Sequence, residues 1–356
     1  MPSSAGASDT TAIRSGEELD ADSLARYLRR NVAGFGAGLE IEQFPGGHSN
    51  LTYLLRSGDR ELVLRRPPLG PVAPRAHDMA REFRVLEALS PHFAPAPNVI
   101  HLCADESVIG AVFYLMERRR GVILRQQAPP EFTVQPAFPQ RASLAFIDCL
   151  AQLHSIDIFK RGLASLGRPE GFLARQVEGW TGRWERAKTG EILIMDRVGR
   201  WLHDHLPPSQ AATVVHNDFK LDNIMLDPAN PGRVVAVLDW EMTSVGDPLI
   251  DLGIVMCYWP ELGDPLPRRN AISPLTTHPG WMSRAELMKR YHEKTGFDLA
   301  RMRYYEVFGL FKLAVVLQQI YCRYRAGQTA DERFRDFDSR VRGLAESAGY
   351  VMSRPQ

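Results

Sequence analysis

This chain has few cysteines, almost no net charge and few long apolar runs. The four cysteines form no C-x-x-C pair, which argues against a cysteine zinc site or a disulfide framework and favours a reducing compartment. Because 43 basic residues balance 42 acidic ones to a net charge of +1, the composition favours neither a nucleic-acid partner nor a membrane surface. We therefore expect a cytoplasmic protein with neither kind of partner.

Membrane-spanning and targeting patterns are missing as well. The most apolar long segment, residues 307–321, contains Lys312, Gln318 and Gln319, so we expect a buried helix there. The first twenty residues have neither an apolar signal segment nor an Arg-rich amphipathic face, and they predict a flexible arm over residues 1–20. No Walker A phosphate-binding sequence is present.

The N-terminal third has the pattern of a small antiparallel sheet with a packed helix, which we place at residues 21–117. Two strand-like runs flank the turn sequence SGDR and predict a hairpin that places Arg65 near the end of its second strand. Residues 77–90 carry one apolar stripe and predict a helix. A short helix and two more strands are expected at residues 21–32, 98–103 and 107–116.

The remainder, residues 118–356, predicts a larger and mostly helical lobe after a Pro-rich linker. Ser283 and Glu286 form a capping box, and Thr329 with Glu332 suggests another before the last helix. Residues 257–281 read as one long irregular connection, a candidate lid or binding loop. Other helices are expected at residues 142–156, 191–205 and 302–325. Two such lobes give an α+β chain with a cleft.

One polar stretch stands out within this second lobe. VVHNDFKLDN and the following LDW place Asp218, Asn223 and Asp239 at the tips of apolar runs. Burying carboxylates without partners costs several kcal/mol, so such a cluster predicts a functional site. The alternative is a polar turn between core strands, and the fixed spacing favours function.

This spacing, His216-x-Asp218-x-x-x-x-Asn223 followed by Asp239, resembles the signature of the aminoglycoside phosphotransferase and choline kinase superfamily, which has a bilobal protein-kinase-like fold. The resemblance implies ATP and Mg²⁺ as cofactors, with residues 21–117 binding the nucleotide and residues 118–356 the substrate. It implies that Asp218 is the catalytic base or the group that orients the hydroxyl, that Lys220 contacts phosphate, and that Asn223 and Asp239 bind Mg²⁺. It also implies that three residues brace the loop: His216, Asp247 and Asp251.

The same resemblance points to a nucleotide site in the N-terminal lobe. Arg65 stands where the family normally has a lysine, and it is expected to pair with Glu82. For Gly46 and Gly47 a simple turn is an equal alternative to phosphate binding. The other candidate nucleotide contacts are His48, Ser49, Asn50, Met116 and Glu117. Three aromatic residues either line an acceptor pocket or pack the connection down: Tyr258, Trp259 and Trp281.

The resemblance to this superfamily extends over residues 41–348. Features such as VLRRPP, YWP and PLTTHPGW are similar to the kinase-like domain that is fused to acyl-CoA dehydrogenases in eukaryotes, which implies a hydroxy acid or hydroxyacyl-CoA as acceptor. The alternatives are an aminoglycoside or choline type of kinase, and a catalytically weak nucleotide- or acyl-binding module. His154, on an apolar helix face, predicts a hydrogen-bonded core histidine. The acceptor, the choice of ATP or GTP and the oligomeric state are left open.

Overall fold

The computed structural model describes residues 9–35, 38–45, 50–69, 77–329 and 331–354. The chain separates into two compact units, which we call unit 1 (Met1–Arg120) and unit 2 (Gly121–Gln356). Each unit is described by itself. Neighbouring strands of unit 1 are antiparallel and form a five-stranded sheet in the order β1-β2-β3-β5-β4. The elements of unit 1 are α1 (Ala21–Asn31), β1 (Glu40–Gln43), β2 (Leu51–Ser57), β3 (Arg60–Arg66), α2 (Met79–Leu89), β4 (Val99–Cys103) and β5 (Phe113–Glu117).

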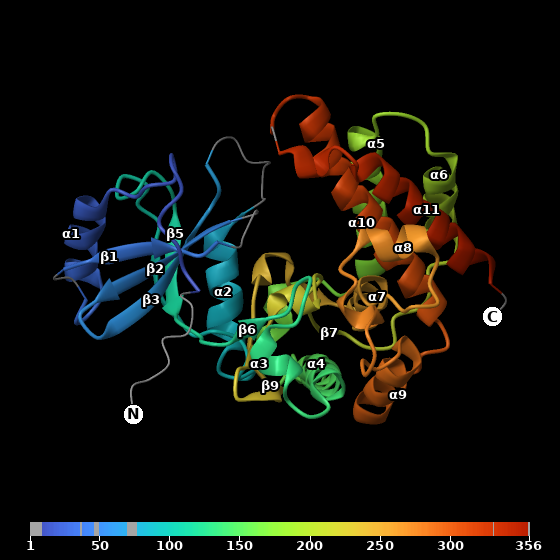
Figure 1. Ribbon diagram of the computed structural model, residues 1–356, viewed down its shortest axis with the longest axis horizontal. Coiled ribbons are helices and arrows are strands. Elements are labelled where there is room, and N and C mark those ends of the chain that lie inside the picture. Colours follow the sequence, from blue (N-terminus) through green and yellow to red (C-terminus); the bar gives the residue numbers. More distant parts are fainter. Residues whose placement is uncertain (1–8, 36–37, 46–49, 70–76, 330, 355–356) are drawn as a thin grey trace. The chain divides into compact units, whose positions relative to one another are not determined.

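The sheet of unit 1 lies between its two helices (Figure 1). Tyr53 of β2 and Leu64 of β3 belong to the core on the α1 side. Tyr114 of β5 points to the other face, where its ring meets Phe83 of α2 with centroids 6.2 Å apart. Side chains alternate along a strand, so Arg65 shares the α2 face. The alternation of side chains along β3 therefore points Arg65 toward helix α2.

The predicted hairpin is confirmed, since β2 and β3 pair from Leu51↔Arg66 to Ser57↔Arg60 around Gly58. The predicted second strand over residues 107–116 is wrong in its first half, because β5 begins only at Phe113. Asp105 accepts hydrogen bonds from the backbone N–H and the hydroxyl of Ser107. These local bonds and a left-handed Gly110, with φ 77°, replace strand by turn.

The expected flexible arm differs from what the structure shows for residues 9–20. Thr11 forms an antiparallel bridge with Gln43 of the edge strand. The Gln43 side chain accepts a 2.8 Å hydrogen bond from the Arg14 N–H, and the Tyr53 hydroxyl donates to the Glu17 carbonyl at 2.6 Å. The open edge of β1 offers unpaired backbone groups, and this segment satisfies those of Gln43. Residues 1–8 lie outside the described part.

Unit 2 is mostly helical with two small sheets, β10-β7 and β6-β8-β9. Its helices include the long α10 (Met302–Arg325), against which α7 (Leu249–Tyr258) packs. Its strands are β6 (Val122–Ile123), β7 (Thr213–Val215), β8 (Ile224–Asp227), β9 (Asn230–Val237) and β10 (Ser244–Gly246). Its other α-helices are α3 (Pro130–Thr133), α4 (Phe138–His154), α5 (Phe172–Ala187), α6 (Leu193–Asp204), α8 (Leu266–Ala271), α9 (Arg284–Thr295) and α11 (Phe337–Ser353). Short 3₁₀ turns are η1 (Leu163–Leu166), η2 (Leu221–Asn223), η3 (Trp240–Met242), η4 (Leu275–Thr277) and η5 (Glu332–Phe334).

Glycine permits the close approach of α7 and α10. A Cβ at Gly253 would lie 2.3 Å from the Tyr305 carbonyl oxygen, and one at Gly309 would lie 2.6 Å from the Gly253 carbonyl oxygen. Only a residue without a side chain fits at either position. The crossing fixes Asp251 on α7 and Lys312 on α10 within one rigid block.

Several expectations for unit 2 need correction. Helix α5 was not predicted at all, and the connection expected to be irregular over residues 257–281 contains α8 and η4. Instead of Thr329, Asp331 caps the turn η5, accepting a hydrogen bond from the Arg333 N–H, and α11 begins only at Phe337. The capping box of Ser283 and Glu286 is confirmed at the start of α9.

Candidate active site

The polar loop of unit 2, residues 216–223, connects β7 to β8. Its far end is tied to the end of the neighbouring strand β9, because the Leu238 N–H donates to the Asn223 carbonyl at 2.8 Å. Strand β9 ends at Val237, and Asp239 is the second residue after it. The two stretches that carry the predicted polar residues are therefore adjacent in space.

Two residues of this region have left-handed backbone conformations that side chains normally avoid. Asn217 has φ 64° and Asp239 has φ 68°. Such a conformation costs on the order of 1–3 kcal/mol outside glycine and persists where the surroundings hold it. Asn and Asp tolerate it better than most residues, and its presence is typical of functional sites.

Asp218, Lys220 and Asn223 form one hydrogen-bonded cluster. The Lys220 Nζ lies 2.8 Å from the Asp218 Oδ2. The Asn223 Nδ2 donates to the same carboxylate oxygen at 3.0 Å and to the Asp218 carbonyl at 2.9 Å. The Asp218 side chain remains 18% exposed, so a small molecule can reach a carboxylate whose orientation is fixed.

The charges around Asp218 favour its ionised form. Burial alone would raise the pKa of the Asp218 carboxyl, but the nearby ammonium groups of Lys220 and Lys312 outweigh burial and lower it. Burial would likewise lower the pKa of Lys220, but Tyr258 and Asp218 raise it. The pair is consequently a carboxylate beside an ammonium at neutral pH.

His216 is buried and held as a neutral ring. Its Nδ1 accepts a hydrogen bond from the Asp218 N–H at 3.2 Å, so its Nε2 carries the proton that is donated to the Leu238 carbonyl at 3.0 Å. Burial lowers the pKa of His216, which agrees with this neutral form. The ring thus joins the start of the polar loop to the residue before Asp239.

Asp251 on α7 binds the polar loop from beneath. Its carboxylate oxygens accept from the backbone N–H groups of His216 and Asn217, each at 2.7 Å. The Nε2 of His154 lies 3.2 Å from the same carboxylate, and Tyr291 bonds the other ring nitrogen, which confirms His154 as a hydrogen-bonded core histidine.

Asp247, the other acidic residue of this stretch, is also buried. It accepts from the Leu249 N–H at 2.9 Å and from the Tyr305 hydroxyl at 2.8 Å. Burial raises the pKa of Asp247. These two bonds connect Asp247 to α7, which carries Asp251, and to α10.

In unit 1 the ion pair expected for Arg65 is present. The Arg65 Nε lies 3.0 Å from the Glu82 Oε2, and the Glu82 side chain is only 1% exposed. Arg66 points to the opposite face and donates to the Ile109 carbonyl at 2.9 Å. Asn50 is near the Nδ1 of His77, with its Oδ1 at 2.9 Å.

The other residues predicted to contact the nucleotide have different environments. Met116 is buried in β5. The Glu117 carboxylate accepts from the Asn98 N–H at 2.7 Å and contacts Arg119. Four candidates lie outside the described residues: Gly46, Gly47, His48 and Ser49.

The three aromatic candidates have different environments. Tyr258 is partly exposed, and the Lys220 Nζ lies 5.1 Å from its ring centroid. Trp259 is 1% exposed, donates to the Met282 carbonyl at 2.8 Å and packs on Phe146. Trp281 packs edge-on against Trp259.

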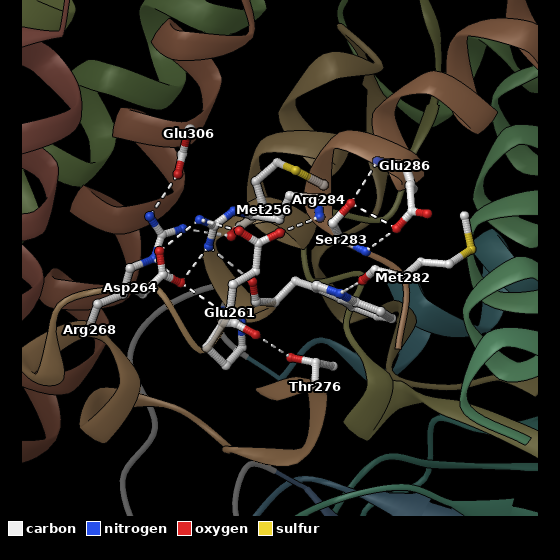
Figure 2. A network of polar contacts seen from close by, with 12 residues as sticks. Met256, Glu261, Asp264, Arg268, Thr276, Met282, Ser283, Arg284, Glu286 and Glu306 are labelled. Carbon is white, nitrogen blue, oxygen red and sulfur yellow. Dashed lines mark hydrogen bonds and ion pairs between the residues drawn. The ribbon is translucent and has the colours of Figure 1, made fainter. Parts of the chain in front are cut away.

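A buried polar network fixes the connection that follows Trp259, as Figure 2 shows. Arg284 forms two hydrogen bonds with the Asp264 carboxylate, at 2.6 and 2.7 Å. Arg268 donates to Glu306 and to the Met256 carbonyl, both at 2.8 Å. The connection is thus built onto α7 and α10 and is not an unattached lid.

Lys312 was not predicted as part of the site. Its ammonium donates to the Asn217 carbonyl, one residue before Asp218. The sequence signal was available, because a lysine within an otherwise apolar helix needs a buried partner. The partner itself is 95 positions away along the chain, and no local pattern identifies it.

The elements of the two units are those of a kinase-like α+β fold, and comparison with known proteins shows the family. The model of the phosphotransferase enzyme family matches residues 40–304. The chain belongs to this family. A Ralstonia eutropha JMP134 crystal structure assigned to the aminoglycoside phosphotransferases is 32% identical, with a TM-score of 0.79, and the match covers 95% of this chain and 100% of that one.

Two further comparisons concern a more distant structure and longer proteins. A thermostable mutant of the aminoglycoside phosphotransferase APH(4)-Ia, solved with AMP-PNP and hygromycin B, shares the fold at 17% identity and TM-score 0.59, over 94% of this chain and 100% of that one. Acyl-CoA dehydrogenase family member 11 of Pongo abelii is 36% identical over 99% of this chain and 46% of its own length. Member 10 of Mus musculus is 34% identical over 98% of this chain and 32% of its own length. The chain therefore spans less than half of these relatives.

Two searches of the described residues gave no match. Within ranges 9–35, 38–45, 50–69, 77–329 and 331–354, no helix is long and apolar enough to span a membrane. In the same part of the chain, no group of three or more His, Cys, Asp or Glu is arranged to hold a metal ion.

Proposed function

We propose that this chain is an ATP-dependent, Mg²⁺-requiring kinase that transfers the γ-phosphate to a hydroxyl group of a small molecule. The observation that carries the proposal is the ionised and partly exposed Asp218 carboxylate, oriented by Lys220 and Asn223 in a member of the phosphotransferase family. Phosphoryl transfer needs positioning and electrostatic stabilisation more than covalent chemistry. A rigid loop that presents a carboxylate beside an ammonium meets that need.

In this proposal each residue of the polar loop has its own task. Asp218 orients the acceptor hydroxyl and takes its proton, for which its lowered pKa keeps it ready at neutral pH. Lys220 places positive charge beside it for the phosphate oxygens. Tyr258, whose ring lies beside Lys220, contributes to the acceptor surface.

Asn223 and Asp239 fit a magnesium ion by their chemistry. The Asn223 amide nitrogen is bound to Asp218, which leaves the amide oxygen as its metal-ligating atom, and Asp239 provides a carboxylate. Mg²⁺ prefers oxygen ligands and usually takes only one or two protein side chains plus phosphates and water. A bound ion would neutralise negative charge on the phosphate oxygens.

Unit 1 supplies the nucleotide side of the proposal. Arg65, held at Glu82, has the planar guanidinium that pairs with phosphate oxygens, and it replaces the lysine common in kinase-like folds. A structure that shares the fold was solved with AMP-PNP, which supports ATP as the nucleotide. For the acceptor we propose a hydroxy acid or a hydroxyacyl-CoA, because relatives at 34% and 36% identity are acyl-CoA dehydrogenase family members.

The test is a transfer screen with Mg²⁺-ATP against hydroxy acids, their coenzyme A esters, aminoglycosides and choline-like alcohols. We expect ADP formation that depends on one acceptor class. Asp218→Ala should lower turnover by about 10²- to 10⁴-fold, the usual contribution of a general base, while nucleotide binding persists. Asp227→Ala, which removes a carboxylate on β8 that pairs with Arg233, is the matched control and should keep turnover. Unchanged turnover in Asp218→Ala would disprove the assignment.

The second candidate is a nucleotide- or acyl-binding module with little catalytic activity. The observation that favours it is Arg65 in the position of the usual lysine. It predicts that Mg²⁺-ATP raises the thermal unfolding midpoint while no compound of the same screen accepts phosphate. Acceptor-dependent ADP formation would exclude this module.

A further inference from the structure

Unit 2 contains a buried lysine that the proposed reaction does not use. Lys312, in the middle of α10, is 6% exposed, and its neighbours Phe311 and Leu313 are buried hydrophobic residues. Removing an ammonium group from water costs several kcal/mol unless partners compensate. A methionine would fill a similar space without that cost, so the charge calls for an explanation.

The partners of Lys312 lie on the underside of the polar loop. Its ammonium donates to the Asn217 carbonyl and lies 5.2 Å from the centroid of the Trp180 ring on α5. Its charge interacts favourably with Asp218 and Asp251. Lys220 and Arg183 are the like charges near it. Burial, the largest influence, lowers the pKa of Lys312 to about 8.

Asn217 is the residue on which these contacts converge. Its N–H donates to the Asp251 Oδ1 at 2.7 Å, and its side-chain Nδ2 donates to the Met242 carbonyl at 2.9 Å. Its own carbonyl is bound by Lys312. Three different elements thus hold Asn217 in its left-handed conformation, with φ 64°. Asp218 is the next residue along the chain.

We propose that Lys312 is a positioning residue for phosphoryl transfer: from the buried side of the polar loop, it fixes the peptide between Asn217 and Asp218. Only the catalytic part of this inference rests on the proposed role of Asp218. The geometric part, that Lys312 sets the conformation of the loop, stands on the contacts alone.

The substitution Lys312→Met tests this, because it keeps the length and removes the charge and the donor. We expect kcat to fall roughly 10- to 100-fold, the cost of a small misplacement of a catalytic group, with little change in KM for ATP. A fall in kcat without a matching change in KM separates misplacement of Asp218 from loss of substrate binding.

A matched control lies on the same helix. Gln318 is 1% exposed and donates to the Ala187 carbonyl at 2.9 Å, away from the polar loop. Gln318→Met should lower the unfolding midpoint while leaving kcat and KM for ATP unchanged. If Lys312→Met lowers the unfolding midpoint in the same way and also leaves kcat unchanged, Lys312 is structural and the proposal is overturned.

Lys312→Gln keeps a donor while it removes the charge, and it is the second variant if Lys312→Met does not fold. The amide can still donate to the Asn217 carbonyl, so the loop should keep its conformation and kcat should stay closer to that of the wild type than in Lys312→Met. A folded Lys312→Gln enzyme that loses as much kcat as Lys312→Met contradicts the role of this hydrogen bond.

A crystal structure of the Lys312→Met protein provides a measurement that needs no acceptor. We expect Asn217 to leave the left-handed conformation and Asp218 to lose its hydrogen bond with the Asn223 Nδ2. A loop identical to that of the wild type would refute the proposal. Absence of phosphate transfer by the wild-type protein would instead refute the proposed function and leave this structural comparison valid.

Discussion

At the scale of single residues, Arg65 is the clearest departure from the kinase-like pattern. Its Nε is bound to Glu82 at 3.0 Å, so the guanidinium is oriented before any ligand arrives. Arginine presents several donors in a planar fork, which suits two phosphate oxygens better than a single ammonium does. We therefore regard Arg65 as a working substitute for lysine.

Replacing this arginine tests that view. Arg65→Met should raise KM for ATP by at least about tenfold, since hydrogen bonds to charged groups contribute about 1.5–3 kcal/mol. Arg65→Lys should raise it less, because the positive charge remains. Arg56→Met is the control, since Arg56 pairs with Glu61 at 3.1 Å on the same hairpin. Equal KM values in Arg65→Met and the wild type would show that Arg65 does not bind ATP.

The sequence motif grouped residues that are close together in the structure. His216, Asp218, Asn223 and Asp239 were identified as a set, and the structure brings their two chain stretches together. Lys312 was missed because its partner is distant in sequence. Trp259 was named as a pocket candidate, but its burial depends on Phe146 of a separate helix, which no local pattern reveals.

At the scale of elements, hydrophobic periodicity located most helices and strands but not their ends. The strand expected over residues 107–116 was shortened by hydrogen bonds that Ser107 donates to Asp105. Helix α5 was overlooked, although it buries Trp180 and Trp184 against the rest of unit 2. Residues 257–281 looked irregular because the forces that order them are ion pairs between residues far apart, such as Arg284 and Asp264.

The ion-pair network of this connection gives an element-scale prediction. The side chain of Arg268 is 2% exposed and binds Glu306 at 2.8 Å. Arg268→Met leaves a carboxylate without its partner, and breaking a buried pair typically costs about 3–5 kcal/mol. Denaturant unfolding followed by tryptophan fluorescence should show that loss.

Arg269→Met is the control from the same short helix. Among the residues that the structure describes, the Arg269 side chain forms no ion pair, so its loss should change stability far less. Equal stability of the two variants would mean that the network does not order the connection.

At the scale of the whole molecule, the two units have separate cores. Leu24 and Leu28 of α1 belong to a cluster formed only by residues of unit 1. Leu310 is fully buried in α10 of unit 2. We propose that the units correspond to the expected nucleotide-binding and catalytic domains and that they unfold as separable cooperative blocks.

The tryptophans make this proposal testable, since all six lie in unit 2, at positions 180, 184, 201, 240, 259 and 281. Tryptophan fluorescence therefore follows unit 2 alone, whereas far-ultraviolet circular dichroism follows both units. Truncating a buried leucine to alanine typically costs about 2–5 kcal/mol. Leu24→Ala should lower the circular-dichroism midpoint of unit 1 and leave the fluorescence midpoint in place.

The reciprocal variant completes the test. Leu310→Ala removes a side chain of the same type and burial from unit 2, so it should lower the fluorescence midpoint. If Leu24→Ala lowers the fluorescence midpoint as much as Leu310→Ala does, the chain unfolds as one block. In that case the stability of the polar loop would depend on the core of unit 1, and loop variants would have to be compared at matched global stability.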